Sequence, residues 1–338
     1  MAITSTHIKW SATAIGAVVI VAAVFWLTQR QVAALAPLPP VTIAMPTQIS
    51  SAPMIVANAQ GLFKTAGVQV ITQPFLLGKD ALASMLEGKA DLAIVADTPL
   101  MNAVLAGKDV AILAAISQSR RALAIVAHTT SGINTIPDLV GKSITMPQGT
   151  NQPYFLDAML RAHGVDHHKL TTVDLKVPDG IAAFKAGSVD AIVVFQPFLA
   201  QLEADLGNKI KVFYGHDVYA FRFLLVGKPA YIRQHEPAVQ RVLQGLIAGT
   251  QTLRTHPDIA RLAVGAAVKV EDTLMRKIWD PQDFAITLDQ GLLLALEDQT
   301  RWAMQRGLVK PGPLPNYLNV MRFEPLEAVM PSGIKITH

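Results

Sequence analysis

Two expected helix N-termini in this sequence carry small polar residues of the kind that can hold an anion. In the segment SITMPQGTNQP, Gly149, Thr150 and Asn151 come just before a helix whose first turn contains a proline. Free backbone N–H groups and the helix dipole at such a place favour a negative charge, and Gly149 lets that charge approach the backbone. Ordinary N-capping by Thr150 or Asn151 is the alternative for this segment alone. Because Thr98, in Asp-Thr-Pro, presents the same choice, the two segments together favour contact with a ligand.

Side chains of other kinds could complete such a site. Gln196 follows a short apolar run, and its neutral amide can donate and accept hydrogen bonds but cannot pair with an ammonium group as a carboxylate would. Arg222, like Arg120 and Arg121, is a candidate cationic anchor near a strand end, and a solvated surface position is the alternative for each. Four aromatic residues could line an apolar part of a pocket or pack in the core: Phe75, Tyr154, Phe195 and Phe221.

The sequence offers no catalytic or metal-binding constellation. It contains no cysteine, which excludes disulfides, thiolate metal sites and cysteine nucleophiles. His163, His167 and His168 lie close together, but nothing completes a set with metal-ligand spacing, so we expect a solvated loop there. The motifs of serine hydrolases, P-loops, dinucleotide-binding folds and zinc proteases do not occur. We therefore expect a protein that binds a ligand without catalysis, cofactor or metal.

The elements that would position these residues contain an internal repeat. The segments GKADLAIVADTPL from Gly88 and GSVDAIVVFQPF from Gly187 share one pattern. In each, a Gly ends a helix, an Asp opens a short apolar run, and a Pro begins the next helix. Such a run is typical of a strand buried on both faces in a parallel sheet. Two copies predict two α/β lobes with ligand-binding turns at their strand ends and a cleft between them.

The rest of the folded part alternates between strand-like and helix-like segments. We expect a helix over 53–63, and a strand over 221–226 that returns the chain to the first lobe. From Pro229 the pattern is helical, with expected helices at 236–255, 257–268, 271–279 and 287–306. We assign no role to the Pro-rich segment after Pro311.

The composition fits a protein of two ordinary domains that is exported. Of the 338 residues, 51% are hydrophobic and 16% are charged, which gives each lobe enough apolar residues for its own core. The net charge of +4 is small and no basic patch is interleaved with aromatic residues, which argues against nucleic acid as a partner. Residues 10–27 are almost entirely apolar, so they are either an uncleaved membrane anchor or part of a cleaved signal peptide. A stiff Pro-rich spacer follows at 37–40.

With these motifs the chain resembles the periplasmic solute-binding proteins of the aliphatic sulfonate, taurine and nitrate uptake class. That class belongs to a broader group that shares its fold with the thiamine-pyrimidine synthases. The resemblance runs from about Val41 to about Lys310, and three segments carry most of it: 87–99, 139–150 and 186–198. It implies a type II periplasmic binding protein fold, α/β, with two lobes around a cleft and one apolar helix before them.

The resemblance also implies a function and a partner. A solute-binding protein of this class closes its lobes on a small, anionic organic solute and presents it to an ABC permease in the inner membrane. Sulfonate-binding relatives often carry an acidic residue where this sequence has Gln196, which argues against a taurine-like zwitterion. The residues that we expect to bind the solute, partly from the resemblance and partly from residue type, are Gln48, Thr98, Gly149, Thr150, Asn151, Gln196 and Arg222.

Several alternatives stay open at this point. The solute could be sulfonate-like, nitrate-like or pyrimidine-like, and the protein could be a membrane-tethered sensor of the same fold. An enzyme is a further alternative, although enzymes of the group rely on cysteine. We expect a periplasmic monomer, free or anchored to the inner membrane through residues 10–27. The expected organisation is a signal peptide or anchor over 1–36, a spacer over 37–40, a first lobe over 41–128 and 222–310, a second lobe over 129–221, and a Pro-rich tail over 311–338.

Overall fold

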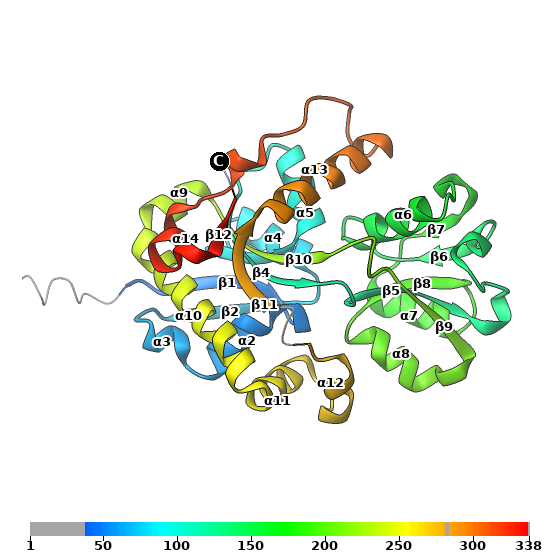
Figure 1. Cartoon of the computed structure of the whole chain (residues 1–338), viewed down its shortest axis with the longest axis horizontal. Coiled ribbons are helices and arrows are strands. Elements are labelled where there is room, and N and C mark those ends of the chain that lie inside the picture. Colours follow the sequence, from blue (N-terminus) through cyan, green and yellow to red (C-terminus); the bar gives the residue numbers. More distant parts are fainter. Residues whose placement is uncertain (1–37, 281–283, 337–338) are drawn as a thin grey trace, which may run out of the picture. The chain divides into compact units, whose positions relative to one another are not determined.

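Two β-sheets organise the described part of the chain (Figure 1). The computed structural model describes residues 38–280 and 284–336, and residues from Pro39 onward form one compact unit. The expected apolar N-terminal helix and the rest of the signal or anchor segment lie outside the described residues. None of the helices in the described ranges combines the length and the hydropathy that a bilayer span requires.

The first sheet has seven strands, in the order β12-β11-β4-β10-β3-β1-β2. Their bounds are β1 Val41–Pro46, β2 Val70–Phe75, β3 Leu92–Ala96, β4 Ala111–Ser119, β10 Phe221–Gly227, β11 Phe284–Asp289 and β12 Ile334–Lys335. Strands β2, β1 and β3 are parallel, and β10 lies antiparallel between β3 and β4. Every residue of β3 and of β10 is buried, which explains why the sequence is continuously apolar in β3 and nearly so in β10.

The second sheet has five strands, in the order β7-β6-β8-β5-β9. Their bounds are β5 Leu123–His128, β6 Ser143–Thr145, β7 Thr171–Val173, β8 Ala191–Phe195 and β9 Ile210–Tyr214. Strands β7, β6 and β8 are parallel, whereas β5 is antiparallel to both β8 and β9. Phe184, Ile192 and Leu199 are among the residues of a buried apolar core beside this sheet.

The two copies of the repeated motif have the same structural role. Gly88 and Gly187 both have positive φ, 79° and 69°, which is the left-handed conformation that ends a helix. The Asp91 carboxylate accepts a hydrogen bond from the backbone N–H of Thr42, at 2.7 Å, and Asp190 accepts one from Ser143, at 2.8 Å. In each sheet the aspartate therefore ties the start of one strand to the start of its parallel neighbour.

Helices cover both sheets. Their bounds are α2 Ala52–Ala59, α3 Leu62–Thr65, α4 Gly78–Leu86, α5 Asp97–Leu105, α6 Gln152–Ala162, α7 Val177–Lys185, α8 Phe198–Leu206, α9 Pro229–Gln234, α10 Glu236–Thr255, α11 Pro257–Val268, α12 Asp272–Ile278, α13 Gln290–Gln305 and α14 Glu324–Val329. Helices α2 and α10 cross very closely, since a Cβ atom at Gly249 would lie 2.5 Å from the carbonyl oxygen of Pro53. Only glycine permits that distance without a shift of backbone.

Two short segments carry the chain between the sheets. Residues 120–122 connect β4 to β5, and residues 215–220 connect β9 to β10. The two connections are bonded to each other, because the Arg120 guanidinium donates to the carbonyl oxygen of His216 at 2.8 Å. As the sequence predicts, the segment from Phe221 returns the chain to the first sheet, between β3 and β4.

Three sequence-based expectations differ from the structure. The expected helix over 53–63 is two helices, because Gly61 adopts a positive φ of 66° between them. The expected helix over 287–306 is wrong at its start: residues 284–289 form β11, and α13 begins only at Gln290. The segment after Pro311 is part of the fold, because Tyr317 is fully buried and β12 pairs with β11.

Candidate functional site

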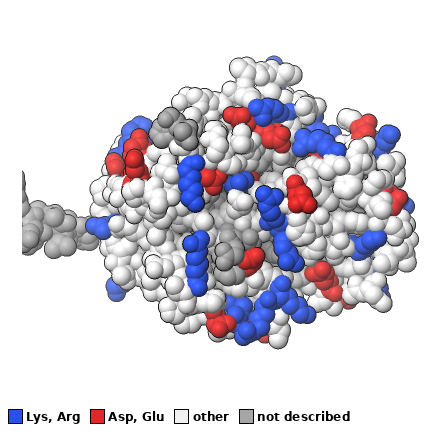
Figure 2. Space-filling model, viewed as in Figure 1, with Lys and Arg blue, Asp and Glu red and all other residues white. Residues whose placement is uncertain are grey.

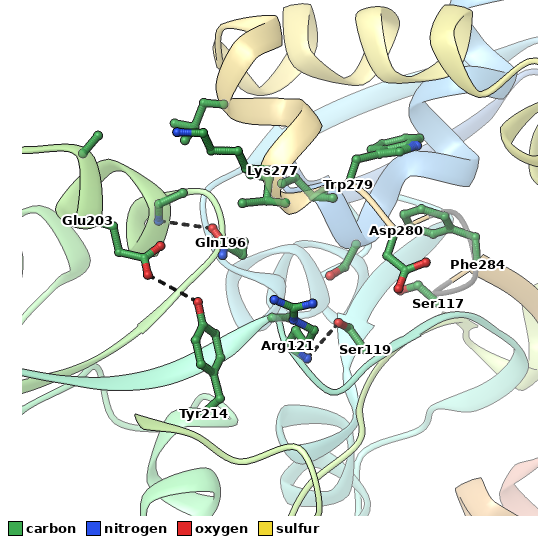
Figure 3. Close-up of a pocket in the computed structure, with 17 residues that line it drawn as sticks. Ser117, Ser119, Arg121, Gln196, Glu203, Tyr214, Lys277, Trp279, Asp280 and Phe284 are labelled. Atoms are coloured by element: carbon green, nitrogen blue, oxygen red, sulfur yellow. Dashed lines mark hydrogen bonds between the residues drawn. The ribbon is translucent and has the colours of Figure 1, made fainter. Parts of the chain in front are cut away.

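A cavity of about 470 Å³ lies where residues of both sheets meet helix α12 (Figure 3). The chain reaches it from the loop after β1, the end of β4, the crossover at 121–122, helix α8, the end of β9, helix α12 with the two residues after it, and the first residue of β11. Its lining residues are Ile49, Ser50, Ser117, Ser119, Arg121, Ala122, Gln196, Ala200, Glu203, Ala204, Tyr214, Leu274, Lys277, Ile278, Trp279, Asp280 and Phe284. A cavity of this size can hold a small organic molecule.

Hydrogen-bond donors predominate on the polar wall of the cavity. Ser119 accepts a hydrogen bond from the backbone N–H of Arg121 at 3.2 Å, which leaves its own hydroxyl hydrogen free to donate. The Gln196 carbonyl oxygen accepts from Ala200 N–H at 3.2 Å, so the amide NH₂ is the part that can face a ligand. The Ser117 hydroxyl is buried and has no hydrogen-bond partner among the described residues. Such a wall suits a ligand that carries acceptor atoms.

Cationic groups strengthen this preference. Figure 3 shows the Arg121 guanidinium near the middle of the cavity, with Gln196 and Glu203 on the α8 side and Lys277 on the α12 side. The guanidinium carbon lies 5.9 Å from the centroid of the Tyr214 ring. Neither Arg121 nor Lys277 forms an ion pair within the described ranges. Both positive charges are therefore available to an anion.

A second, much smaller cavity of about 20 Å³ contains three of the predicted binding residues, Gln48, Thr150 and Asn151. Consecutive residues line the two cavities at three places: Gln48 and Ile49, Ala122 and Leu123, and Phe195 and Gln196. The two cavities therefore lie next to each other, although no residue lines both. The smaller one has room for about one water molecule.

A family profile described as "NMT1/THI5 like" matches residues 48–260, which is more than half of the chain. The chain belongs to the NMT1/THI5-like family. It is 27% identical over 218 residues to a protein of Bacillus subtilis (strain 168) named as an aliphatic sulfonates-binding protein, an alignment that covers 63% of this chain and 65% of that one. An Escherichia coli (strain K12) protein of the same name is 28% identical over 124 residues, covering 37% of this chain and 39% of that one. The chain thus spans less than two thirds of either relative.

Solved structures show the same fold for this NMT1/THI5-like chain. The alkanesulfonate-binding protein SsuA from Xanthomonas axonopodis pv. citri, solved with MOPS bound, superposes with a TM-score of 0.73 at 19% identity, covering 85% of this chain and 99% of that one. The desulfurization enzyme DSZB superposes with a TM-score of 0.66 at 16% identity, covering 86% and 99%. A Candida albicans protein described as having the generic periplasmic binding protein fold gives 0.66 at 14% identity. The α/β fold predicted from the sequence, that of the periplasmic binding proteins, is therefore confirmed.

The predicted binding residues of this family member do not all reach one cavity. Gln196 lines the larger cavity, whereas Thr98, Gly149 and Arg222 line neither of the two. Thr98 is completely buried, and its backbone N–H donates to the carboxylate of Asp97 at 3.0 Å, so this helix N-terminus already faces a negative charge. The Thr150 hydroxyl donates to the Pro147 carbonyl and accepts from Gln152 N–H, so it is bonded within its own turn. The ligand-binding role of these residues stays a prediction.

Most residues of the larger cavity are absent from the site predicted from the sequence. Arg121 is one of three candidate anchors in the sequence, but the predicted site contains Arg222 instead, which is 7% exposed and donates to the Ala220 carbonyl. Glu203 and Lys277 occupy exposed positions on helices and carry no motif. Their shared location depends on packing between segments far apart in the chain, which no local pattern could show.

Of the three clustered histidines, His167 has a structural role, and its interpretation as part of a solvated loop is wrong. Its Nε2 faces the Arg306 Nη2 atom at 2.5 Å, and its Nδ1 is hydrogen-bonded to the buried carboxylate of Asp157. Because a guanidinium can only donate, Nε2 accepts and Nδ1 carries the hydrogen. His163 and His168 are exposed, and the described ranges hold no group of three or more His, Asp or Glu side chains placed for a metal ion.

A buried carboxyl group beside the small cavity makes stability depend on pH. Burial raises the pKa of Asp97 from 3.8 to about 6, against the opposing effects of the Tyr219 hydroxyl, which donates to it, and the Arg222 charge. Between these two pH values the folded state holds more protons than the unfolded state, so the free energy of unfolding should fall as pH rises through this window. We expect Asp97→Asn to remove that fall. Urea unfolding of both proteins below, within and above the window measures it, and an unchanged pH profile in the variant would contradict the assignment.

Proposed function

We propose that this protein is the extracytoplasmic solute-binding component of an ABC uptake system and that its solute is a small organic anion. Membership of the NMT1/THI5-like family and the names of the two bacterial relatives support the transport role. The sulfonate-binding proteins among the structural neighbours share the fold. A sulfonate or a carboxylate on a short carbon chain is the class of solute that fits these relatives.

The observation that carries the proposal is the Arg121 guanidinium in the 470 Å³ cavity, without an acidic partner among the described residues. A guanidinium presents several N–H donors in one plane, which matches the oxygen atoms of a sulfonate or carboxylate. Ser119 and Gln196 offer further donors next to it. On the opposite side, Trp279 packs against Phe284 with ring centroids 5.6 Å apart and supplies an apolar wall for the carbon chain.

One face of the molecule carries a concentration of positive side chains. On the face shown in Figure 2, Lys and Arg side chains gather along the middle, and fewer Asp and Glu side chains lie among them. Such a distribution attracts negatively charged solutes and raises their association rate.

Closure of the two sheets on the solute is the mechanism that we propose. Only the two short connections at 120–122 and 215–220 link β4 to β5 and β9 to β10, and their mutual hydrogen bond lets them act as one hinge. Across from the hinge, the Lys79 ammonium donates to the carbonyl oxygen of Gln148 at 2.8 Å and joins the two sides beside the small cavity. In this proposal Gln48, Thr150 and Asn151 form the floor that the solute meets when the sides separate.

The proposal places the protein in the periplasm, free or tethered through residues 10–27, as a monomer that docks on an inner-membrane permease. It includes no turnover. The fold neighbour DSZB is an enzyme, and a variant of it in which Ser replaces a Cys was solved with biphenyl-2-sulfinic acid bound. This chain contains no cysteine at all, which leaves it without a nucleophile of that type.

A panel of solutes tests the proposed function. We expect the melting temperature of the purified full chain to rise with propanesulfonate or butyrate and to stay unchanged with uncharged propanol. A solute at 100 times its dissociation constant adds about 2.7 kcal/mol to the free energy of unfolding, which is easily measured. If nitrate, pyrimidines, sulfonates and carboxylates all leave the melting temperature unchanged, the proposed function is wrong.

A further inference from the structure

We propose that Asp157 determines how the two sheets separate: its carboxylate holds α6 on α13, so that the large cavity opens on the other side, between α8 and α12. Asp157 does not line this cavity, and its role is that of a positioning residue. The inference rests on the proposed closure of the two sheets, and it adds the direction of the movement and a residue that sets this direction. A solute therefore enters and leaves between α8 and α12.

The first step is that α6 and α13 pack on different sheets but are bonded to each other. Helix α6 packs on β5 and β8 of the second sheet, whereas α13 packs on α5 of the first. The Asp157 side chain is 4% exposed, accepts a hydrogen bond from the Trp302 indole N–H at 2.7 Å and lies 2.8 Å from the Arg306 Nε atom. Separation of the two helices would leave this buried charge without partners, which is strongly unfavourable. We call these three side chains the seam, together with Tyr154, whose hydroxyl donates to Asp298 at 2.5 Å.

The second step is that a row of aromatic rings joins the seam to the connections between the sheets. The Tyr154 ring stands edge-on to the rings of Tyr219 and Trp302, with centroids 5.0 Å and 5.3 Å apart. Edge-to-face packing of this kind is favourable. Tyr219 belongs to the connection at 215–220, and Trp302 belongs to the seam. A rotation about the line from this connection to the seam is therefore the movement that leaves both in place.

The third step concerns α8 and α12, which line the large cavity from its two sides. Figure 3 shows Glu203 on the α8 side and Lys277 on the α12 side. The side chains of α8 bond to residues of its own side, as Glu203 does with Tyr214 and Asp205 with Lys185. Those of α12 bond to one another or to α11. Among the described residues, no hydrogen bond or ion pair joins α8 to α12, so the mouth of the cavity between them opens without breaking one.

A further bond between the two sides lies next to the seam. It runs from the Lys79 ammonium to the carbonyl oxygen of Gln148, and Gln148 lines a cavity of about 210 Å³ together with Trp302 and Arg306. Figure 1 shows α13 and α6 in the upper half of the view and α12 and α8 in the lower half. The described bonds between the two sides are therefore concentrated at the seam and the connections, away from α8 and α12.

Two pairs of spin labels test the direction of opening on the purified full chain. The sequence has no cysteine, so labels attach only to cysteines that are introduced. Gln201→Cys with Thr273→Cys spans the mouth from α8 to α12, and Ala162→Cys with Gln305→Cys spans the seam from α6 to α13. None of these four residues lines the large cavity. Without solute, pulsed EPR should give a distance distribution about twofold wider at the mouth than at the seam. Propanesulfonate should narrow the distribution at the mouth only.

Asp157→Asn tests whether this carboxylate sets the direction. In the variant the seam distribution should widen about twofold, to a width like that of the mouth. A residue that only stabilises the fold would lower the melting temperature and leave the seam narrow. Glu297→Gln is the control, because it breaks an ion pair with Arg301 within α13 that does not reach α6, and it should keep the wild-type widths. If Asp157→Asn does not fold, Trp302→Phe removes one donor to the carboxylate and should widen the seam in its place.

The outcomes separate this inference from the proposed function, because the comparison of widths needs no solute. If the wild-type seam is as wide as the mouth, or the mouth as narrow as the seam, the inference is wrong. If the seam stays narrow in both Asp157→Asn and Trp302→Phe, or if Glu297→Gln widens it equally, Asp157 does not set the direction. If the widths are as expected but no solute of the panel narrows the mouth, the proposed function fails and the direction of opening stands.

Discussion

Arg121→Gln should lower the affinity for propanesulfonate about 100-fold, the largest effect on binding that we expect from one substitution. The glutamine side chain keeps one pair of N–H donors but loses the positive charge and the planar fork that matches two sulfonate oxygens. The charge matters most here because Arg121 lies near the middle of the cavity, over the face of Tyr214, with no acidic partner among the described residues. Calorimetric titration of the wild type and the variant measures the change.

Arg120→Gln is the matched control for this substitution. Arg120 is the neighbouring residue and has the same charge, but its guanidinium donates to the His216 carbonyl and does not line the cavity. We expect it to change the affinity for propanesulfonate by no more than about threefold. Both arginines are exposed, so neither variant should lose more than about 1 kcal/mol of unfolding free energy. If Arg121→Gln and the wild type bind propanesulfonate equally well, the anion does not bind at Arg121, and the helix N-termini predicted from the sequence become the expected site.

The fold could be predicted from the sequence because its signals are local and repeated. In both copies of the repeated motif the Gly ends a helix, the Asp bonds to the start of the neighbouring strand, and the apolar run forms a buried strand. Each of these signals can be recognised within about a dozen residues. The strand β11 could not be predicted, because its signals are not local. Its alternating burial fits a half-buried strand, but the segment adjoins a long helical pattern, and the pairing partner β4 lies more than 160 residues earlier in the chain.

The candidate site was harder to predict than the fold. Local motifs at helix N-termini point to Thr98 and Thr150, but the backbone N–H of Thr98 and the hydroxyl of Thr150 are already bonded within their own turns. The larger cavity instead combines Arg121, Glu203 and Lys277, which come from a crossover and two separate helices. Nothing in the residue types of the last two distinguishes them from solvated surface charges. Their role depends on how the segments pack, and a single sequence does not contain that information.

Asp157→Asn should destabilise the folded protein by about 3 kcal/mol, the largest effect on stability that we expect. The Asp157 carboxylate on α6 is 4% exposed and lies 2.8 Å from the Arg306 Nε atom, and it accepts a hydrogen bond from the Trp302 indole N–H at 2.7 Å. His167 Nδ1 donates to the other carboxylate oxygen. An asparagine would leave the positive charge of Arg306 without its partner. Its amide N–H groups would also face the N–H donors that now point at the carboxylate. Urea unfolding measures the loss.

The position of these bonds explains why we expect the effect to exceed that of an ordinary ion pair. Helix α6 covers the second sheet, whereas α13 packs on α5 of the first, so the Asp157 carboxylate fastens one layer to the other. Asp205→Asn, which breaks the exposed pair with Lys185, provides the comparison and should cost no more than about 1 kcal/mol. If the two variants lose equal stability, the buried carboxylate does not hold α6 on α13. If Asp157→Asn loses about 3 kcal/mol and Trp302→Phe loses part of it, the buried carboxylate is a main link between α6 and α13, beside the hydrogen bond from the Tyr154 hydroxyl to Asp298.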